Sequence, residues 1–270
     1  MQPEAVAVQV DHVSREFIAR KRRALALRDV SVTVREREVV GIVGPTGCGK
    51  TTLLNLIAGF DTPTSGLIRV YGKQFLGPGP DRGFIFQQPN LFPWLSVREN
   101  VAFAVRYGRD LPALAGTRQH LMARTDALIE EVGLSNALHL FPHQISGGMK
   151  SRAALARVLL ASPAVLLMDE PFAALDAQTR IQMHTLLLHL LRSGEMKTVV
   201  LITHDVEEAL VLCDRIYILS SSPGQVVAEY VVPFGRPREY SDVARRAEFV
   251  ELKFEVLGRL EVYGDAGGVR

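Results

Sequence analysis

Short apolar runs alternate with helical patterns along most of the chain. The runs are rich in Val, Ile and Leu and have few polar positions inside them, which is typical of strands buried on both faces. They occupy residues 38–43, 165–168, 199–203 and 215–219. The helical patterns occupy residues 50–58, 150–161 and 180–191. Strands that alternate with helices in this way predict an α/β fold with a mainly parallel sheet covered on both faces.

Other segments add to this pattern without changing it. Residues 6–10 and 30–34 alternate between apolar and polar positions, which predicts half-buried strands. Residues 96–138 have a mostly helical pattern, and the Gly- and Pro-rich residues 77–81 predict a surface loop. The residues after Pro223 are too few for a typical independent domain.

Composition narrows the class of protein. The 270 residues are 47% hydrophobic and 22% charged, with a formal net charge of +2, so the whole chain shows no preference for nucleic acid. Two cysteines, Cys48 and Cys213, argue against a disulfide framework and agree with a reducing cytosol. The first ten residues lack a signal-peptide pattern, and no window reaches the roughly 18 apolar residues of a membrane-spanning helix.

A glycine-rich loop joins the strand at 38–43 to the helix at 50–58. It reads Gly44-Pro45-Thr46-Gly47-Cys48-Gly49-Lys50-Thr51 and is followed by Thr52. Its glycines allow backbone amides to approach phosphate, and the helix N-terminus adds a positive dipole. Lys50 would neutralise phosphate charge, while the Thr51 hydroxyl would bind Mg²⁺. The spacing predicts an ATP site and does not fit the dinucleotide pattern; the alternative is a Gly-rich turn with an exposed lysine.

Polar residues follow two of the apolar runs. Asp169 and Glu170 end the run at 165–168, and His204 ends the run at 199–203. Ligands bind at the carboxyl ends of parallel strands, so Asp169 would face Mg²⁺ and Glu170 would polarise the attacking water. Asp169 as a helix N-cap and His204 as a structural histidine are the alternatives.

A third motif, Ser146-Gly147-Gly148, stands at the predicted start of the helix at 150–161. Taken with the phosphate loop and the acidic run in this order, it resembles the signature of ABC transporter nucleotide-binding subunits. Ile145 and Met149 replace the usual leucine and glutamine. The resemblance implies that the signature closes over ATP held by a second subunit. On its own, the motif is better explained as a capped helix start.

The resemblance assigns further residues. It implies that Gln87 senses Mg²⁺ and the transmembrane partner, that His204 is a catalytic switch, and that Phe17 stacks on adenine. Phe17 as an ordinary strand residue is the alternative. The motif Ala174-Leu175-Asp176 would meet the partner subunit.

The same resemblance implies a P-loop ABC cassette with an antiparallel β-subdomain and an inserted helical subdomain. The expected division is a core at 1–90 and 161–222, a helical subdomain at about 91–160, and a short extension at 223–270. The protein would hydrolyse ATP as a homodimer beside two membrane permease subunits, on the inner face of the membrane, with a solute-binding protein acting indirectly. The substrate would resemble nitrate, sulfonates or taurine. A non-transport ATPase acting on a soluble complex is the alternative.

Three further features of the sequence lead to predictions about single segments or residues. Phe92 and Trp94 lie in a Pro-rich segment and either anchor this loop or receive a helix of the permease. The basic run at 20–23 predicts a solvated hairpin loop. Cys48 at a helix N-terminus should have a lowered thiol pKa, and ATP should protect it from modification.

Overall fold

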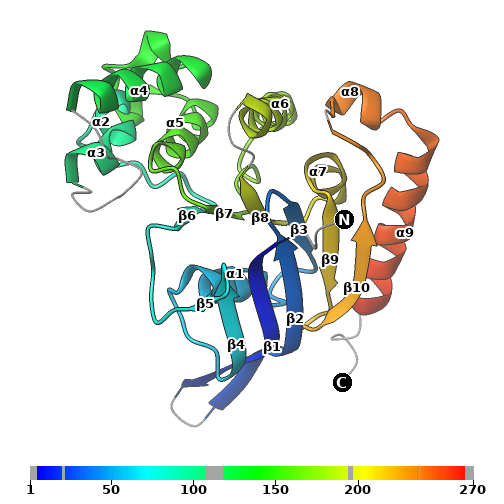
Figure 1. The fold of residues 1–270 in the computed structure, drawn as a ribbon. Coiled ribbons are helices and arrows are strands. Elements are labelled where there is room, and N and C mark those ends of the chain that lie inside the picture. The colour runs from blue at the N-terminus through cyan, green and yellow to red at the C-terminus, as the bar shows by residue number, and fades with distance from the viewer. Residues whose placement is uncertain (1–4, 20–21, 108–117, 194–196, 237, 265–270) are drawn as a thin grey trace.

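The computed structural model describes residues 5–19, 22–107, 118–193, 197–236 and 238–264 (Figure 1). The strands are β1 (Val6–Ala19), β2 (Arg22–Arg35), β3 (Val39–Val43), β4 (Ser65–Val70), β5 (Lys73–Gln74), β6 (Arg82–Ile85), β7 (Val165–Asp169), β8 (Thr198–Thr203), β9 (Arg215–Leu219) and β10 (Val226–Val231). The helices are α1 (Lys50–Ala58), α2 (Val97–Val101), α3 (Phe103–Tyr107), α4 (Arg118–Glu131), α5 (Gly147–Leu160), α6 (Ala177–Ser193), α7 (Val206–Leu212), α8 (Tyr240–Val243) and α9 (Ala247–Gly264).

A six-stranded sheet forms the centre of the molecule, with strand order β10-β9-β3-β8-β7-β6. The five strands from β9 to β6 are parallel, and β10 pairs antiparallel with β9 at the edge. The predicted mainly parallel sheet is therefore confirmed. All five residues of β3, β7 and β9 are buried, which explains why their sequences lack polar alternation.

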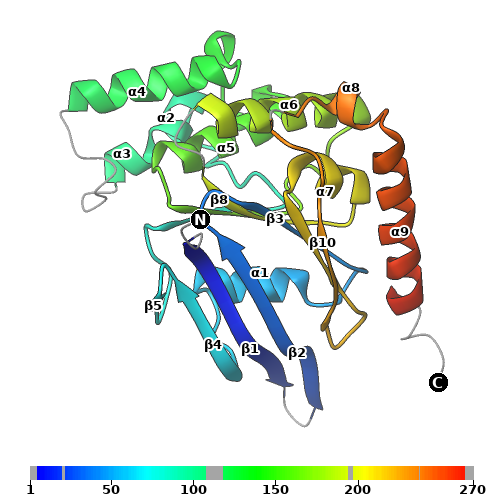
Figure 2. The same cartoon turned by 45° about the vertical axis from the view of Figure 1, so that its right-hand side comes forward.

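Successive side chains of the central strands enter two different cores. Val40 and Ile42 point to α1 and the second sheet, whereas Val39 and Val43 point to the face covered by α6, α7 and α9. Helix α1 is packed between the two sheets (Figure 2). This alternation follows from the two-residue period of a strand and fixes which face of the sheet each side chain packs on.

The second sheet is antiparallel, with order β2-β1-β4-β5. Its strands β1 and β2 are much longer than the segments predicted at 6–10 and 30–34, because their pairing continues toward the hairpin through several register shifts. The alternation of apolar and polar residues is lost at those shifts, so it predicted only part of each strand. Within the basic run at 20–23, residues 20 and 21 lie outside the described part of the chain.

Helices α2 to α5 form a separate group beyond β6 and β7 (Figure 1). They enclose their own apolar cluster, which includes Val101, Ile129, Ala153 and Leu160. A bidentate ion pair joins Arg98 of α2 to Asp126 of α4, at 2.6 and 2.7 Å. This group corresponds to the helical pattern predicted between the phosphate loop and the acidic strand.

The chain after residue 222 adds β10 to the central sheet and then lays α9 beside α7 (Figure 2). Val256 and Phe249 of α9 are buried in the central core. Among the described residues, no helix combines the length and apolar character needed to cross a membrane.

Candidate nucleotide-binding site

The glycine-rich loop lies at the carboxyl end of β3 and leads directly into α1. Gly47 and Gly49 have φ angles of 78° and 102°, which non-glycine residues rarely adopt. A Cβ atom on Gly49 would stand 2.8 Å from the carbonyl oxygen of Ala26 in β2. The loop therefore needs glycine at this position both for its backbone angle and for its contact with the antiparallel sheet.

Lys50 begins α1, and its side chain turns back across the loop. The Nζ atom donates hydrogen bonds to the carbonyl oxygens of Gly44 at 2.8 Å and Pro45 at 2.9 Å. Thr46 and Gly47 are exposed at the crest of the loop, and Thr51 and Thr52 complete the first turn of α1. The positive end of this helix and one ammonium thus face the same small region, which suits a phosphate group.

Cys48 does not have the reactivity expected from its sequence position. Its side chain is fully buried, and this burial raises the thiol pKa above its usual value even though Lys50 is nearby. The predicted lowering of the pKa is wrong, because the thiol points into the core beneath the loop and its thiolate would be desolvated.

Thr51 and Asp169 meet across the gap between α1 and β7. The Thr51 hydroxyl donates a hydrogen bond to Asp169 Oδ1 at 3.1 Å. Burial raises the pKa of the Asp169 carboxyl, although the bond from Thr51 opposes this shift. A hydroxyl and a carboxylate are oxygen ligands of the kind Mg²⁺ prefers. The described residues contain no cluster of three His, Cys, Asp or Glu side chains.

Glu170 and His204 lie opposite each other at the ends of β7 and β8. Their side chains meet, with His204 Nδ1 3.1 Å from Glu170 Oε2. Parallel pairing sets Asp169 beside Ile202, and the Glu170 amide donates to the Ile202 carbonyl at 3.0 Å. Glu170 has a φ of 44°, an unfavourable backbone angle for a residue with a side chain, held here by the flanking strands.

Gln87 and Phe17, both assigned by resemblance, occupy exposed positions. Gln87 lies two residues beyond β6, which pairs with β7, so the strand order places it at the same sheet edge as Asp169. Phe17 lies in β1 opposite Ala24, is 42% exposed, and carries the Arg15 guanidinium 4.6 Å from its ring centre. Their predicted roles remain expectations.

Ser146 caps the N-terminus of α5. Its Oγ accepts a hydrogen bond from the Met149 amide at 3.3 Å, so the helix begins at Gly147, three residues before the predicted start. Ser146 and Gly147 are exposed, whereas a Cβ atom on Gly148 would stand 2.5 Å from Thr179 Cγ2 in α6. The exposed cap is open to a ligand from outside this chain, while Gly148 permits the close packing of α5 on α6.

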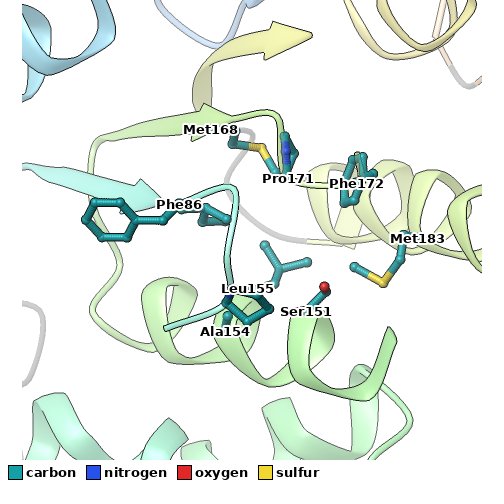
Figure 3. Close-up of a pocket in the computed structure, with 10 residues that line it drawn as sticks. Phe86, Ser151, Ala154, Leu155, Met168, Pro171, Phe172 and Met183 are labelled. Carbon is teal, nitrogen blue, oxygen red and sulfur yellow. The ribbon is translucent and has the colours of Figure 1, made fainter. Parts of the chain in front are cut away.

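A small cavity lies where three of these segments meet (Figure 3). Phe86 reaches it from the segment before Gln87, Leu155 from α5, and Phe172 from the loop after Glu170 (Figure 3). Its volume of about 10 Å³ is no more than one water molecule needs, so it is a packing gap and not a ligand site.

Arg180 and Asp205 also belong to this region, and the sequence analysis did not single them out. Arg180 of α6 contacts Asp205, the N-cap residue of α7, at 3.2 Å. Asp205 directly follows His204 in the sequence, and this position could have identified it as part of the site. Arg180 stands inside an ordinary helical pattern and had no such signal.

The fold and these contacts define a phosphate-loop ATPase with a mainly parallel sheet, a helical insertion and an exposed Ser-Gly-Gly helix start. Residues 27–173 match the family described as ABC transporter. The chain belongs to the ABC transporter family and is an ATP-binding, ATP-hydrolysing subunit.

Two curated relatives are similar over most of their length. A taurine import ATP-binding protein, TauB, from Jannaschia sp. is 43% identical over 239 residues, covering 87% of this chain and 86% of the relative. A nitrate import ATP-binding protein, NrtD, from Synechococcus elongatus is 41% identical over 248 residues, covering 92% and 89%.

A solved structure is similar in fold. It is the dimeric ATP-binding cassette MJ0796 in a post-hydrolysis state with ADP and phosphate, at a TM-score of 0.72 and 30% identity. The match covers 84% of this chain and 100% of that chain. The fold class predicted from the sequence is therefore confirmed.

Proposed function

We propose that this ATPase hydrolyses ATP at the edge formed by the phosphate loop and the carboxyl ends of β7 and β8. The observation that carries the proposal is the convergence of two pairs, Thr51 with Asp169 and Glu170 with His204. The loop amides and Lys50 bind the phosphates, and Glu170 accepts a proton from the attacking water. His204 orients Glu170 and donates to the γ-phosphate. Phe17 stacks on the adenine ring.

Thr51, Asp169 and Gln87 are the residues that would hold Mg²⁺. The partly buried hydroxyl–carboxylate pair fits a hard cation, and Gln87 would supply an amide oxygen from the neighbouring strand end. When bound, the ion neutralises charge on the phosphate oxygens. The chain's own contribution is to present these oxygens at one edge and to keep Lys50 beside them.

A second copy of the chain completes the site. Ser146, Gly147 and Gly148 at the start of α5 would bind the γ-phosphate held by the partner's phosphate loop, since an exposed helix N-terminus attracts anions. The exposed Ser146 cap and the dimeric form of the similar cassette support this arrangement. The active form would be a homodimer that encloses two nucleotides.

The transport step follows from the relatives. Their names specify import of taurine and of nitrate, and a further relative is named for bicarbonate transport. We propose that this subunit powers import of a small solute of the nitrate, sulfonate or taurine kind. Two permease subunits and a solute-binding protein would carry the solute, with this subunit on the inner face of the membrane. The alternative of a soluble complex is not favoured by these relatives.

The permease would dock at the segment that carries Phe92 and Trp94. Phe92 stacks on Phe103 with ring centres 4.3 Å apart and anchors the loop. Trp94 is 69% exposed, and its ring centre lies 5.6 Å from that of Phe92. An exposed tryptophan on an anchored loop suits an interface hot spot. In this proposal Phe92 anchors the loop, and Trp94 receives a helix of the permease.

The substitution Glu170→Gln tests the hydrolytic role. It should lower ATP turnover by roughly 100-fold or more, because the amide cannot accept the proton from water. Nucleotide affinity should remain unchanged, since the phosphate loop is intact. Glu229→Gln is the control, because Glu229 is an acidic residue in β10 that pairs with Arg215 away from this edge. Wild-type turnover in Glu170→Gln would contradict the proposal.

A further inference from the structure

Arg180 joins two segments that are far apart in the sequence. Its Nη2 donates a hydrogen bond to the Leu175 carbonyl at 3.2 Å, and its Nη1 contacts Asp205 Oδ2, also at 3.2 Å. Its Nε atom is buried without a hydrogen-bond partner among the described residues. Burying an unpaired N–H is unfavourable, so helix packing alone gives no reason for an arginine here.

The first segment leads back to Glu170 through two turns. The Ala173 amide donates to the Glu170 carbonyl at 3.2 Å, and the Leu175 amide donates to the Phe172 carbonyl at 3.1 Å. Leu175 is 8% exposed. These two hydrogen-bonded turns fix the position of the Leu175 carbonyl relative to the backbone of Glu170.

The second segment leads to His204. Asp205 caps α7 by accepting from the Glu207 and Glu208 amides at 2.9 and 3.2 Å through Oδ1, which leaves Oδ2 for Arg180. The Asp205 amide donates to Thr203 Oγ1 at 3.0 Å. The backbone of His204 is therefore held on both sides, whereas its side chain is 56% exposed.

These contacts close into a ring, because His204 Nδ1 lies 3.1 Å from Glu170 Oε2. We propose that Arg180 is a positioning residue for ATP hydrolysis, which sets the Glu170–His204 separation by tying the Leu175 carbonyl to Asp205. The inference rests on the proposed roles of Glu170 and His204. It assigns no contact between Arg180 and nucleotide.

Arginine suits this position better than lysine. Its planar guanidinium directs two N–H groups toward two separate acceptors, whereas an ammonium is a single point charge that can favour only one of them. One turn further along both helices, His184 of α6 lies 3.8 Å from Glu208 of α7, and Phe172 contacts the His184 ring edge-on. Buried apolar residues of both helices also share the central core, and this packing keeps the helices together when Arg180 is replaced.

Steady-state ATP hydrolysis by the full chain tests the inference with Arg180→Met, which keeps an unbranched side chain and removes the guanidinium group. We expect kcat to fall about 10- to 100-fold, the cost of slight misplacement of reacting groups. ATP affinity, measured with a fluorescent analogue, should stay within about twofold, since the phosphate loop is untouched. Arg180→Lys should give an intermediate kcat, because one of the two contacts can re-form.

Arg236→Met is the matched control. Arg236 likewise bonds a carboxylate and a carbonyl, Asp214 at 3.0 Å and Leu212 at 3.2 Å, but lies outside the ring. It should change thermal stability without a comparable loss of kcat.

A double-mutant cycle separates positioning from general damage. In a His204→Ala background, Arg180→Met should lower kcat by less than about twofold, because the group it positions is gone. An equal loss in both backgrounds, or a loss carried by ATP affinity, would overturn the inference. Full turnover in Glu170→Gln would instead refute the proposed function, so the two failures are distinguishable.

Discussion

Burial decides the chemistry of both cysteines at the scale of single residues. Cys48 and Cys213 have no exposed surface, and desolvation raises the pKa of each thiol. A helix N-terminus lowers a thiol pKa only when the thiolate can reach it from a polar environment. In this chain the side chain of Cys48 points away from the phosphate-binding surface of its own loop.

Thiol labelling should therefore be slow in the native protein. With N-ethylmaleimide at neutral pH, we expect both cysteines to react at least about tenfold more slowly than in the urea-unfolded chain, because both thiols are buried and protonated. Mass spectrometry of each cysteine peptide over time measures the rates. Rapid native labelling of Cys48 that ATP suppresses would contradict this expectation.

Glu170 shows a different effect at the same scale. Its positive φ is unfavourable for a glutamate. Two hydrogen bonds hold it: the Glu170 amide donates to the Ile202 carbonyl, and the Glu170 carbonyl accepts from the Ala173 amide. Strain of this kind persists where surrounding structure over-determines the backbone. Here it directs the Glu170 side chain toward His204.

At the scale of elements, α9 contains a glycine that its packing does not require. A Cβ atom on Gly258 would meet no atom within 4 Å. Glycine inside a helix is less favourable than alanine because it loses more backbone entropy on folding. The extension therefore has a site at which stability can be raised without touching the nucleotide site.

The substitution Gly258→Ala should raise the free energy of unfolding by about 0.5–1 kcal/mol. Gly83→Ala is the control, because its Cβ would stand 2.5 Å from Val158 Cγ1 and should destabilise the protein. Urea unfolding followed by circular dichroism measures both variants. A lower unfolding midpoint for Gly258→Ala would show that α9 packs differently.

The whole molecule presents the phosphate loop and the proposed second phosphate contact on different parts of the fold. The phosphate loop lies at the end of β3, and the Ser146 cap lies in the helical group (Figure 1). Under the proposed function, a second copy would complete a site divided in this way, since a symmetric dimer brings each patch to its complement.

Mixing two inactive variants should restore activity. Lys50→Ala removes the phosphate-loop cation and Ser146→Glu blocks the helix cap, so each homodimer should be inactive. When equal amounts are mixed, half of the dimers are heterodimers, and each heterodimer has one complete site of two. About one quarter of wild-type turnover is therefore expected. Activity of the Ser146→Glu homodimer alone, or no recovery on mixing, would contradict the divided site.

The sequence by itself determined the alternation of four core strands with α1, α5 and α6, and the residues of the phosphate loop. The limits of α1, Lys50–Ala58, agree with the predicted helix at 50–58, and Gly59 ends it with a φ of 80°. These features depend on local backbone preferences and on burial of whole strands, both of which are visible in residue types. The carboxyl ends at Asp169 and His204 were predictable for the same reason.

Only the tertiary structure decided which polar groups meet and which thiols are buried. The ring through Arg180, Leu175 and Asp205 joins residues on separate elements, and its geometry depends on how α6 packs on α7. Side-chain direction at Cys48 depends on the core beneath α1. The phosphate loop is local and was predictable, whereas its chemical environment depends on long-range packing that no single segment encodes.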